Sequence, residues 1–432
     1  MSRDSSKEGK LVHIPRPPYI PNYDKFEPGK TPVYYSGPYW DGREIGAAVG
    51  SLTTGAWLTT GEQVTRFQNE FGRKFGVRYN HMVNSGSSAN LVMIAALKKH
   101  FNWKDGDEII VSAVSFPTTV APIVQNGLKP VFADVEMDTL NFDLAEVAKK
   151  ITEKTVAIFV SPVLGNPPDL DRLLSIVEDY GLIRILGDNC DSLGTRWSGK
   201  LWTDYCIASS CSFFPAHHIT TGEGGMVSSN DKEIIDLARS FSSWGRACYC
   251  TGAANLLPCG TCGKRFSNWL GGDDIVDHKF VFDNIGYNLK PLDLQGAIGL
   301  EQLKKFDEIE TRRKVNAEFI RGALAKVPGV RTATWAPQAD VSWFGVPIIC
   351  DSREIKESLV RHLEANKIQT RPYFAGNILR HPGYRHLGNA ADYPNAEQAL
   401  DRVFFLGCFP GYTPVVLQYI QDTLWKWQPP KN

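Results

Sequence analysis

The chain has 432 residues and a mass of 48.1 kDa, enough for two or three domains with sizeable buried cores. Its 47 Lys and Arg balance 47 Asp and Glu, so no excess of positive charge supports a nucleic-acid or anionic-membrane surface. No apolar run approaches the roughly 18 residues that span a bilayer, and the start MSRDSSKEGK lacks the apolar stretch of a signal peptide. We therefore expect a cytoplasmic protein with no membrane or nucleic-acid partner.

The first 34 residues hold six prolines and no periodic apolar face. Proline fixes the φ angle and removes a hydrogen-bond donor, which suits a strap lying across another surface. We predict an extended N-terminal arm over residues 1–34.

Helical and strand-like segments alternate from residue 35 onward. The helical spacing of apolar residues predicts helices in EQVTRFQNEFGRKF and NLVMIAALKKH. Short apolar runs follow, among them EIIVSA, VAIFVSP and IRILGD. We read each of them as a strand, and these strands alternate with helices such as PDLDRLLSIVEDY. This alternation predicts an α/β fold with a mostly parallel central sheet flanked by helices. Ligands of such sheets gather beyond the carboxyl ends of the strands.

The domain organisation follows from the same pattern. We predict a large domain over residues 35–309, with a Cys-rich insertion at about 246–270. A long helix at about 292–327 leads out of it, and VSWFGVPIIC and REIKESLVRHLEANK then predict a smaller C-terminal α+β domain over residues 310–432.

Three polar motifs stand at the ends of predicted strands. NSGSSAN precedes a helix, where backbone N–H groups can meet an anion, although a serine there is often only a helix cap. GDNCD follows IRIL, where an Asp either faces a ligand or stabilises a turn. SFFPAHHITTGEGG carries two histidines that are metal ligands, a catalytic base or ordinary packed side chains.

The nine cysteines are unevenly spread. Cys248, Cys250, Cys259 and Cys262 fall inside fifteen residues, and Cys190 follows a strand-like run. In a reducing cytoplasm such a group is more often a metal site than a disulfide scaffold. The single-residue spacing of Cys248 and Cys250 argues against structural zinc, which favours wider pairs.

Together, NSGSSAN, GDNCDSLG, SFFPAHHITTGEGG and GYNLK stand in an order that resembles the DegT/DnrJ/EryC1/StrS sugar aminotransferase family. That family uses pyridoxal phosphate (PLP) on a type I aminotransferase fold. The resemblance implies that Gly86, Ser87 and Ser212 hold the cofactor phosphate. It also implies that Asn288 reaches the phosphate in the neighbouring subunit's site, and hence a homodimer with shared active sites.

The resemblance further implies that Asp188 pairs with the pyridine nitrogen and that Phe116 stacks on the ring. Family aminotransferases carry a Lys where this chain has His217. An imidazole cannot form the family's covalent link to the cofactor. The expected cofactor is therefore pyridoxamine phosphate (PMP), held non-covalently, with His217 as a catalytic base.

This Lys-to-His change resembles the sugar 3-dehydrases, one group of which carries a 2Fe-2S cluster. Cys190, Cys248, Cys250 and Cys262 resemble the cluster ligands of that group, with Cys259 as an alternative to Cys262. Asp191, implied to lie near the cofactor's ring hydroxyl, also resembles the cluster-bearing group. Phe214 departs from it, because a Tyr is expected there.

The implied function is removal of the C3 hydroxyl from a nucleotide-linked 4-keto-6-deoxyhexose for 3,6-dideoxysugar and lipopolysaccharide O-antigen biosynthesis. By resemblance the substrate is CDP-4-dehydro-6-deoxyglucose, and the electron donor is an NADH-dependent iron–sulfur flavin reductase or a ferredoxin. Four alternatives stay open. They are an aminotransferase rescued by Lys290, a cluster-free 3-dehydrase acting on a GDP- or TDP-sugar, a zinc-stapled regulatory relative, and free thiols with no metal.

Overall fold

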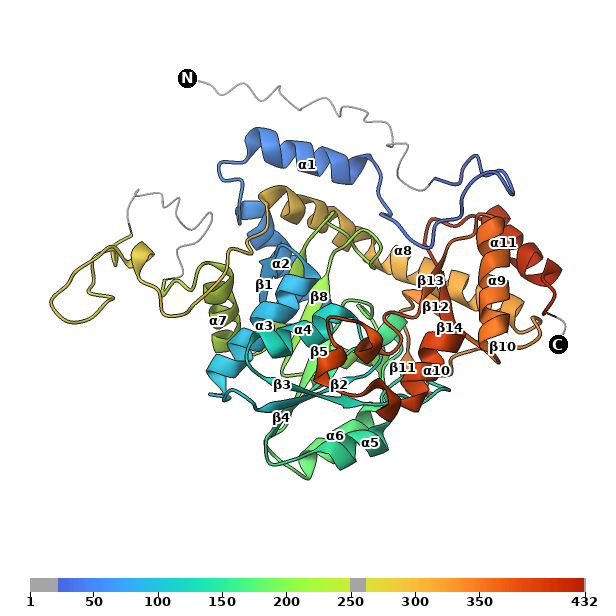
Figure 1. Cartoon of the computed structure of the whole chain (residues 1–432). Helices are drawn as coiled ribbons and strands as arrows, with labels where there is room; N and C mark the ends of the chain where they lie inside the picture. The colour runs from blue at the N-terminus through green and yellow to red at the C-terminus, as the bar shows by residue number, and fades with distance from the viewer. Residues whose placement is uncertain (1–21, 249–261, 431–432) are drawn as a thin grey trace, which may run out of the picture.

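The computed structural model describes residues 22–248 and 262–430. A large domain leads through the long helix α8 (Asp293–Leu324) into a smaller C-terminal domain (Figure 1). The long helix predicted at about 292–327 is thus confirmed, with slightly narrower bounds. The predicted division between residues 309 and 310 falls inside α8, and the domain boundary stays a prediction.

The large domain is built on a seven-stranded sheet with the strand order β1-β9-β8-β5-β4-β2-β3. The strands are β1 (Tyr79–Val83), β2 (Glu108–Ser112), β3 (Lys129–Ala133), β4 (Thr155–Val160), β5 (Arg184–Asp188), β8 (Ala208–Ser212) and β9 (Gly225–Ser229). β9 runs antiparallel to β1 and β8, and the remaining pairs are parallel. The predicted mostly parallel α/β sheet is therefore confirmed, and the carboxyl ends of β1, β2, β4, β5 and β8 share one edge.

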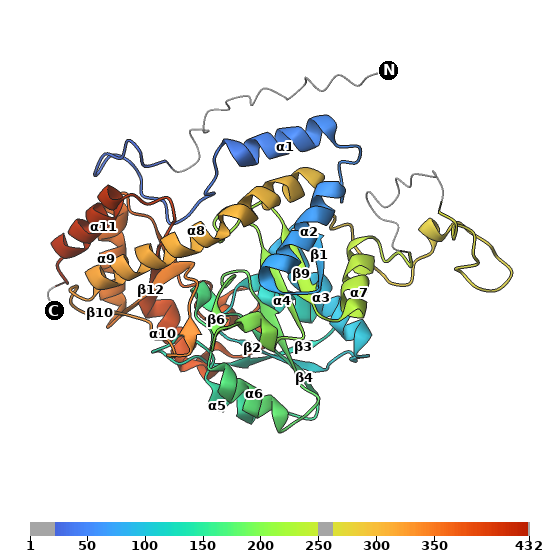
Figure 2. The ribbon, with the colours of Figure 1, turned by 180° about the vertical axis from the view of Figure 1, so that it is seen from behind.

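Both faces of the central strands are buried, which explains why β2 and β4 read as nearly continuous apolar runs. Ile109 and Val111 of β2 join the core that contains α3 and α4, whereas Ile110 joins the core on the side of α5 and α6. Figure 2 shows α5 and α6 lying together, apart from α3 and α4. The large-domain helices are α2 (Glu62–Phe75), α3 (Gly86–His100), α4 (Pro117–Gln125), α5 (Leu144–Lys150), α6 (Leu170–Glu178) and α7 (Lys232–Ser242).

Helix α2 confirms the spacing argument for its segment. Val64, Phe67, Phe71 and Phe75 are all buried, because residues three and four apart share one helix face. Gly76 ends the helix with a φ of 66°, a left-handed conformation that glycine adopts without the Cβ clash of other residues.

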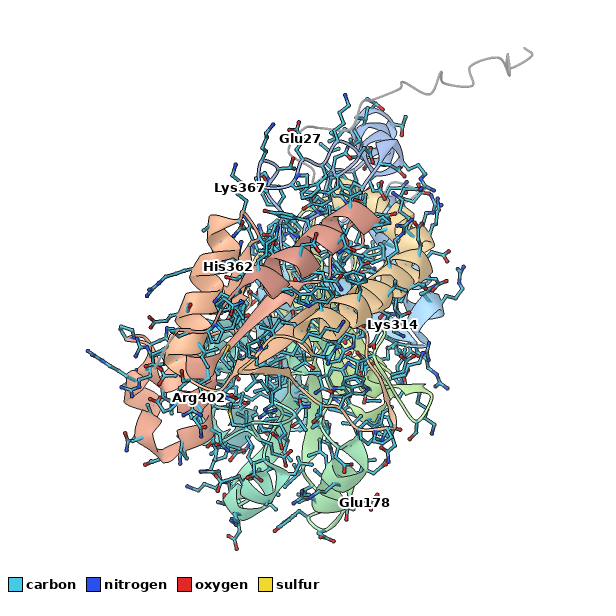
Figure 3. The ribbon with its side chains drawn as sticks, turned by 90° about the vertical axis from the view of Figure 1, so that its right-hand side faces the viewer. Glu27, Glu178, Lys314, His362, Lys367 and Arg402 are labelled. Carbon is cyan, nitrogen blue, oxygen red and sulfur yellow. The ribbon has the colours of Figure 1, made fainter. Side chains whose placement is uncertain are left out.

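The smaller domain holds an antiparallel sheet and three helices, as its α+β pattern predicted. Its strands follow the order β10 (Val330–Thr332), β12 (Gly345–Cys350), β14 (Val403–Gly407) and β13 (Thr370–Pro372). Its helices are α9 (Arg353–Ala365), α10 (Pro394–Arg402) and α11 (Pro414–Lys426). His362 on α9 donates from Nε2 to the Thr423 carbonyl on α11 over 2.9 Å, which joins these helices (Figure 3).

A third, small sheet pairs segments from the two parts of the chain. Its strands are β11 (Ala339–Asp340), β6 (Arg196–Trp197) and β7 (Lys200–Leu201). Lys314 of α8 lies 2.7 Å from the Asp340 carboxylate, so α8 is tied to this sheet (Figure 3). Among the helices of the described ranges, none combines the length and apolarity that crossing a membrane requires.

Residues 22–34, the described part of the predicted arm, lie along the small domain. Val33 pairs with Ile368, and the Lys367 ammonium donates to the Lys30 carbonyl over 3.0 Å (Figure 3). Tyr23 is buried, with its ring centroid 6.4 Å from that of Phe409. Residues 1–21 of the predicted arm lie outside the described residues.

Helix α1 (Gly42–Thr54), which the sequence analysis did not identify, is tied to α8 by a buried ion pair. The Glu44 carboxylate is fully buried and lies 2.6 Å from Nζ of Lys305. Gln302 donates to the same carboxylate over 2.8 Å and accepts from the Thr220 N–H over 3.2 Å. This cluster therefore links α1, α8 and the loop that follows β8.

Replacing one partner of this ion pair should destabilise the fold strongly. Lys305→Met leaves the Glu44 charge buried without its cation, and we expect the free energy of unfolding to fall by about 3–5 kcal/mol in urea titrations. The double variant Glu44→Gln with Lys305→Met should regain much of that loss, because no buried charge is left. An Arg353→Met control at an exposed pair should leave the unfolding midpoint unchanged. Equal stability of the Lys305→Met variant and the wild type would contradict this account.

Candidate active site

The predicted site residues converge where strands of the large sheet end. Gly86 follows β1, Phe116 follows β2, Asp188 ends β5, and Ser212 ends β8, with His217 in the loop beyond it. Because these carboxyl ends share one edge, residues far apart in the sequence meet there.

The Asp188 carboxylate is held rigidly inside the protein. It is 5% exposed, and its Oδ2 accepts from Asn90 Nδ2 over 3.0 Å and from Thr119 Oγ1 over 2.7 Å. The Cys190 N–H donates to Oδ1 over 3.3 Å. In the part of the chain that the structure describes, no Lys or Arg forms an ion pair with it. A buried carboxylate without a protein cation suits a positively charged ligand group, such as a protonated ring nitrogen.

The start of α3 forms an anion cradle next to the end of β8. Ser85 caps the helix by accepting from the Ser88 N–H over 3.1 Å. Gly86 packs so closely that a Cβ added there would lie 2.3 Å from the Cβ of Ser212. Ser87 is exposed at the helix end. Free N–H groups and hydroxyls at the positive end of a helix suit a phosphate, so the predicted residues fit this group.

His217 lies between a backbone carbonyl and a carboxylate. Its Nδ1 is 3.3 Å from the Ser212 carbonyl oxygen, and its Nε2 is 3.5 Å from Oδ1 of Asp191. A carbonyl oxygen only accepts, so Nδ1 carries the proton and Nε2 carries the lone pair. The Leu164 N–H donates to the other Asp191 oxygen over 3.2 Å and fixes that carboxyl group.

Burial sets the charge states of this pair. Burial lowers the pKa of His217 to about 4, against an opposing effect of the Ser212 carbonyl. Burial also raises the pKa of Asp191 to about 7, against the hydrogen bond from Leu164. Near neutral pH the imidazole is therefore uncharged and able to accept a proton at Nε2.

Arg313, which the sequence analysis missed, holds the His217 loop from behind. This α8 residue is 1% exposed, and its Nη2 donates to the carbonyls of Ala216 over 3.0 Å and of His217 over 3.2 Å. Its Nη1 donates to the Phe344 carbonyl over 3.0 Å, and the Phe344 ring packs 5.4 Å from the His217 ring. No sequence motif marks Arg313, because its place emerges only when α8 packs under the loop.

The aromatic candidates border the same region. Phe116 caps α4, is 49% exposed, and packs edge-to-face against Phe374 at 5.7 Å. Phe214 is also exposed and lies 6.0 Å from the His217 ring. Both leave apolar surface open to a ligand.

Asn288 is not joined to Asp188 or His217 by any contact within the described chain. It pairs instead with Ser243, and its neighbour Leu289 accepts from the Asn84 N–H over 2.9 Å. The implied role of Asn288 in a neighbouring subunit's site stays a prediction.

The predicted cluster ligands are not brought together in the described residues. Cys248 is buried, whereas Cys190 and Cys262 are partly exposed, and no three metal-ligating side chains form a group among the described residues. Cys250 and Cys259 lie outside the described ranges. Burial and the Asp188 charge raise the pKa of the Cys190 thiol, which disfavours a thiolate there. Because two of the proposed ligands are not described, the ligand set stays a prediction.

The charge state of His217 can be measured directly. We expect an NMR titration of the imidazole, assigned with a His217→Asn variant, to give a pKa near 4. Arg313→Met should raise this pKa, because the Arg313 cation disfavours the imidazolium, whereas Arg313→Lys should keep it low. The folded pKa lies below the roughly 6.5 of an unfolded His. The unfolded chain therefore binds the extra proton, and this group's contribution to stability falls as the pH drops from about 6.5 to about 4. An unchanged pKa in Arg313→Met would refute the electrostatic role.

Comparison with known sequences identifies close relatives. The sequence profile of the DegT/DnrJ/EryC1/StrS aminotransferase family matches residues 40–424. The chain is 38% identical to dTDP-4-dehydro-2,6-dideoxy-D-glucose 3-dehydratase of Saccharopolyspora spinosa, across 92% of this chain and 87% of that protein. It is 37% identical to the lipopolysaccharide biosynthesis protein RfbH of Salmonella typhimurium, across 91% of each chain.

Solved structures agree with these relatives. Escherichia coli GDP-4-keto-6-deoxy-D-mannose-3-dehydratase with bound hydrated PLP superposes with a TM-score of 0.79 at 32% identity, covering 91% of this chain and all of that one. The predicted type I aminotransferase fold is thus confirmed. The profile match and the identities of 37–38% over nine-tenths of the sequence lead to one conclusion: the chain belongs to the DegT/DnrJ/EryC1/StrS aminotransferase family.

Proposed function

We propose that this chain is a PMP-dependent nucleotide-sugar 3-dehydratase, which removes the C3 hydroxyl of a nucleotide-linked 4-keto-6-deoxyhexose. The observation that carries the proposal is His217, a largely buried, neutral imidazole with a side chain 16% exposed, beside Asp191, at a position where a lysine would make an aminotransferase. Relatives named as 3-dehydratases, at 38% and 36% identity, support the same reaction class.

The site residues suit the phosphate, the ring nitrogen and the ring face of the cofactor. The N–H groups at Gly86 and Ser87, with the Ser212 hydroxyl, would bind its phosphate. Asp188 would hold its ring nitrogen in the protonated state, and Phe116 would cover one ring face. When bound, the cofactor supplies an electron sink for bond breaking next to its amine carbon.

His217 would move the protons of the reaction. Its Nε2 lone pair is free at neutral pH and would take a proton from the C4′ carbon of the cofactor. Nδ1, bonded to the Ser212 carbonyl, keeps the ring oriented. Asp191, within reach of Nε2, would position the imidazole and contact the ring hydroxyl of the cofactor.

Removing the imidazole should stop turnover without releasing the cofactor. We expect His217→Asn to lower kcat by roughly 10²–10⁴-fold. The Kd of PMP, measured by absorbance after dialysis, should stay near the wild-type value, because Asp188 and the α3 cradle remain. A variant with kcat near the wild-type value would sink the assignment of His217 as the base.

The aminotransferase alternative, rescued by Lys290, makes an opposite prediction about covalent attachment. Burial and the nearby Arg246 charge lower the pKa of Lys290 to about 8, so part of it is an unprotonated amine at neutral pH. If His217 replaces the lysine as proposed, borohydride treatment of the PLP-loaded protein should form no covalent adduct on any lysine, as detected by mass spectrometry. A phosphopyridoxyl adduct on Lys290 would favour the aminotransferase.

We also infer, from the resemblance to the cluster-bearing 3-dehydrases, that the chain carries a 2Fe-2S cluster on Cys190, Cys248, Cys250 and Cys262, with Cys259 as the alternative fourth ligand. A reductase or ferredoxin would then supply electrons. Among the described residues, Cys190, Cys248 and Cys262 do not lie together in one group of metal-ligating side chains, so this inference rests on the sequence. The inference that two chains share each active site through Asn288 likewise rests on the sequence resemblance.

Metal content tests the cluster inference. We expect anaerobically purified protein to hold about two irons per chain and to show a reduced-cluster EPR signal that a Cys248→Ser variant loses. Stoichiometric zinc, or no metal at all with full dehydratase turnover, would overturn it. The nucleotide is tested by comparing CDP-, TDP- and GDP-linked substrates, since the relatives are named for dTDP- and GDP-sugars and the sequence resemblance implies CDP.

A further inference from the structure

Two cations gather on one exposed tryptophan near the candidate site. The Lys290 Nζ lies 3.4 Å, and the Arg246 guanidinium 4.7 Å, from the ring centroid of Trp244. The Trp244 ring is 41% exposed. We name Trp244, Arg246 and Lys290 the Trp244 cluster. Its members come from two segments that the Ser243–Asn288 pairing joins.

The two cations of the Trp244 cluster lack an anionic partner. Within the described ranges neither forms an ion pair with a carboxylate, although Asp283 directly follows Phe282, the residue that pairs with Arg246. Among the described residues, the buried Nε of Arg246 has no acceptor, and Lys290 contacts the neutral amide oxygen of Asn288 and the Trp244 ring. Adjacent like charges repel each other. A bound anion would relieve the repulsion and satisfy the free donors.

The backbone here is strained in a way that the packing enforces. Trp244 has a φ of 62°, which is rare for a bulky residue. At the next residue, Gly245, an added Cβ would lie 1.7 Å from the Asn284 carbonyl oxygen. The Trp244 N–H donates to the Tyr287 carbonyl over 2.7 Å. Strain of this kind gathers at ligand sites, where it fixes the direction of a side chain.

The Trp244 cluster lies beside the phosphate cradle. The Asn84 N–H donates to the Leu289 carbonyl over 2.9 Å, which joins the residue before Lys290 to the residue just before the α3 cap. Lys290 therefore follows directly after a residue that is bonded to the chain just before α3, and the N-terminus of that helix attracts anions.

We propose that the Trp244 cluster binds the diphosphate of the nucleotide-linked sugar. This inference rests on the proposed function. Two cations match the two negative charges of a diphosphate diester, and Arg and Lys form strong charge-assisted bonds to phosphate oxygens. The other phosphate source, the cofactor, already has the α3 N–H groups and the Ser87 and Ser212 hydroxyls, so the cluster is available to the nucleotide.

Binding measurements on charge-removed variants test this. In Arg246→Met and Lys290→Met, we expect the Kd of CDP, TDP or GDP, measured by calorimetry, to rise about 10- to 100-fold. The Kd of PMP should not change. Arg246→Lys and Lys290→Arg keep the charge and should recover most of the affinity, which separates charge from folding effects. The matched control is Lys326→Met, since Lys326 lies 4.6 Å from the surface ring of Trp425 and should have no effect.

The outcomes separate this inference from the proposed function. Unchanged nucleotide affinity in both Met variants, with a wild-type chain that dehydrates the nucleotide sugar, overturns the inference alone. A rise in the Kd of PMP with unchanged nucleotide affinity also overturns it and assigns the cluster to the cofactor. Lost nucleotide affinity, with a wild-type chain that transfers amino groups instead of eliminating the hydroxyl, supports the cluster and overturns the dehydratase.

Discussion

Burial of the His217 imidazole is the constraint on which the chemistry of this site depends. An exposed histidine titrates close to neutral pH and would be charged in part. Here the ring packs edge-to-face against Phe344 and donates to the Ser212 carbonyl. It also faces the Asp191 carboxyl group, which burial keeps partly protonated near neutral pH. The low dielectric surroundings therefore hold a free base on Nε2. The same burial requires hydrogen-bond donors for the carbonyl groups of the loop, and Arg313 donates to the carbonyls of Ala216 and His217.

Several charged side chains in and near the site form no ion pair with an opposite charge among the described residues. The buried Asp188 carboxylate accepts hydrogen bonds from neutral donors. The buried Arg313 guanidinium donates to carbonyl oxygens. The cations of Arg246 and Lys290 both lie over the Trp244 ring. Isolated charges of this kind cost stability. They make sense where a ligand of opposite charge arrives: a protonated ring for Asp188 and a diphosphate for the Trp244 cluster. The cation of Arg313 has a different use, because it disfavours a second positive charge on His217.

The cysteines show the limit of a linear motif. Their spacing resembles a cluster ligand set, yet Cys190 lies against Asp188 in the large sheet, while Cys248 and Cys262 belong to the segments that flank the undescribed residues 249–261. Sequence spacing restricts which residues can meet but does not bring them together. Three thiolates from separate segments form a site only if the backbone carries them to one point.

The sequence by itself determined the architecture and the family. Alternating apolar strands and amphipathic helices specified a parallel sheet, since hydrophobic periodicity is a local property, and the motifs around Gly86, Asp188 and His217 lie at strand ends that any such sheet brings to one edge. The tertiary structure decided what pattern cannot encode. Helix α1, with its buried Glu44, and the place of Arg313 under the His217 loop depend on the packing of α8, and Arg313 is 96 residues from His217 along the chain. The pKa values of His217 and Asp191 depend on the depth at which packing buries them, and two cations share the Trp244 ring because two distant segments pair through Ser243 and Asn288.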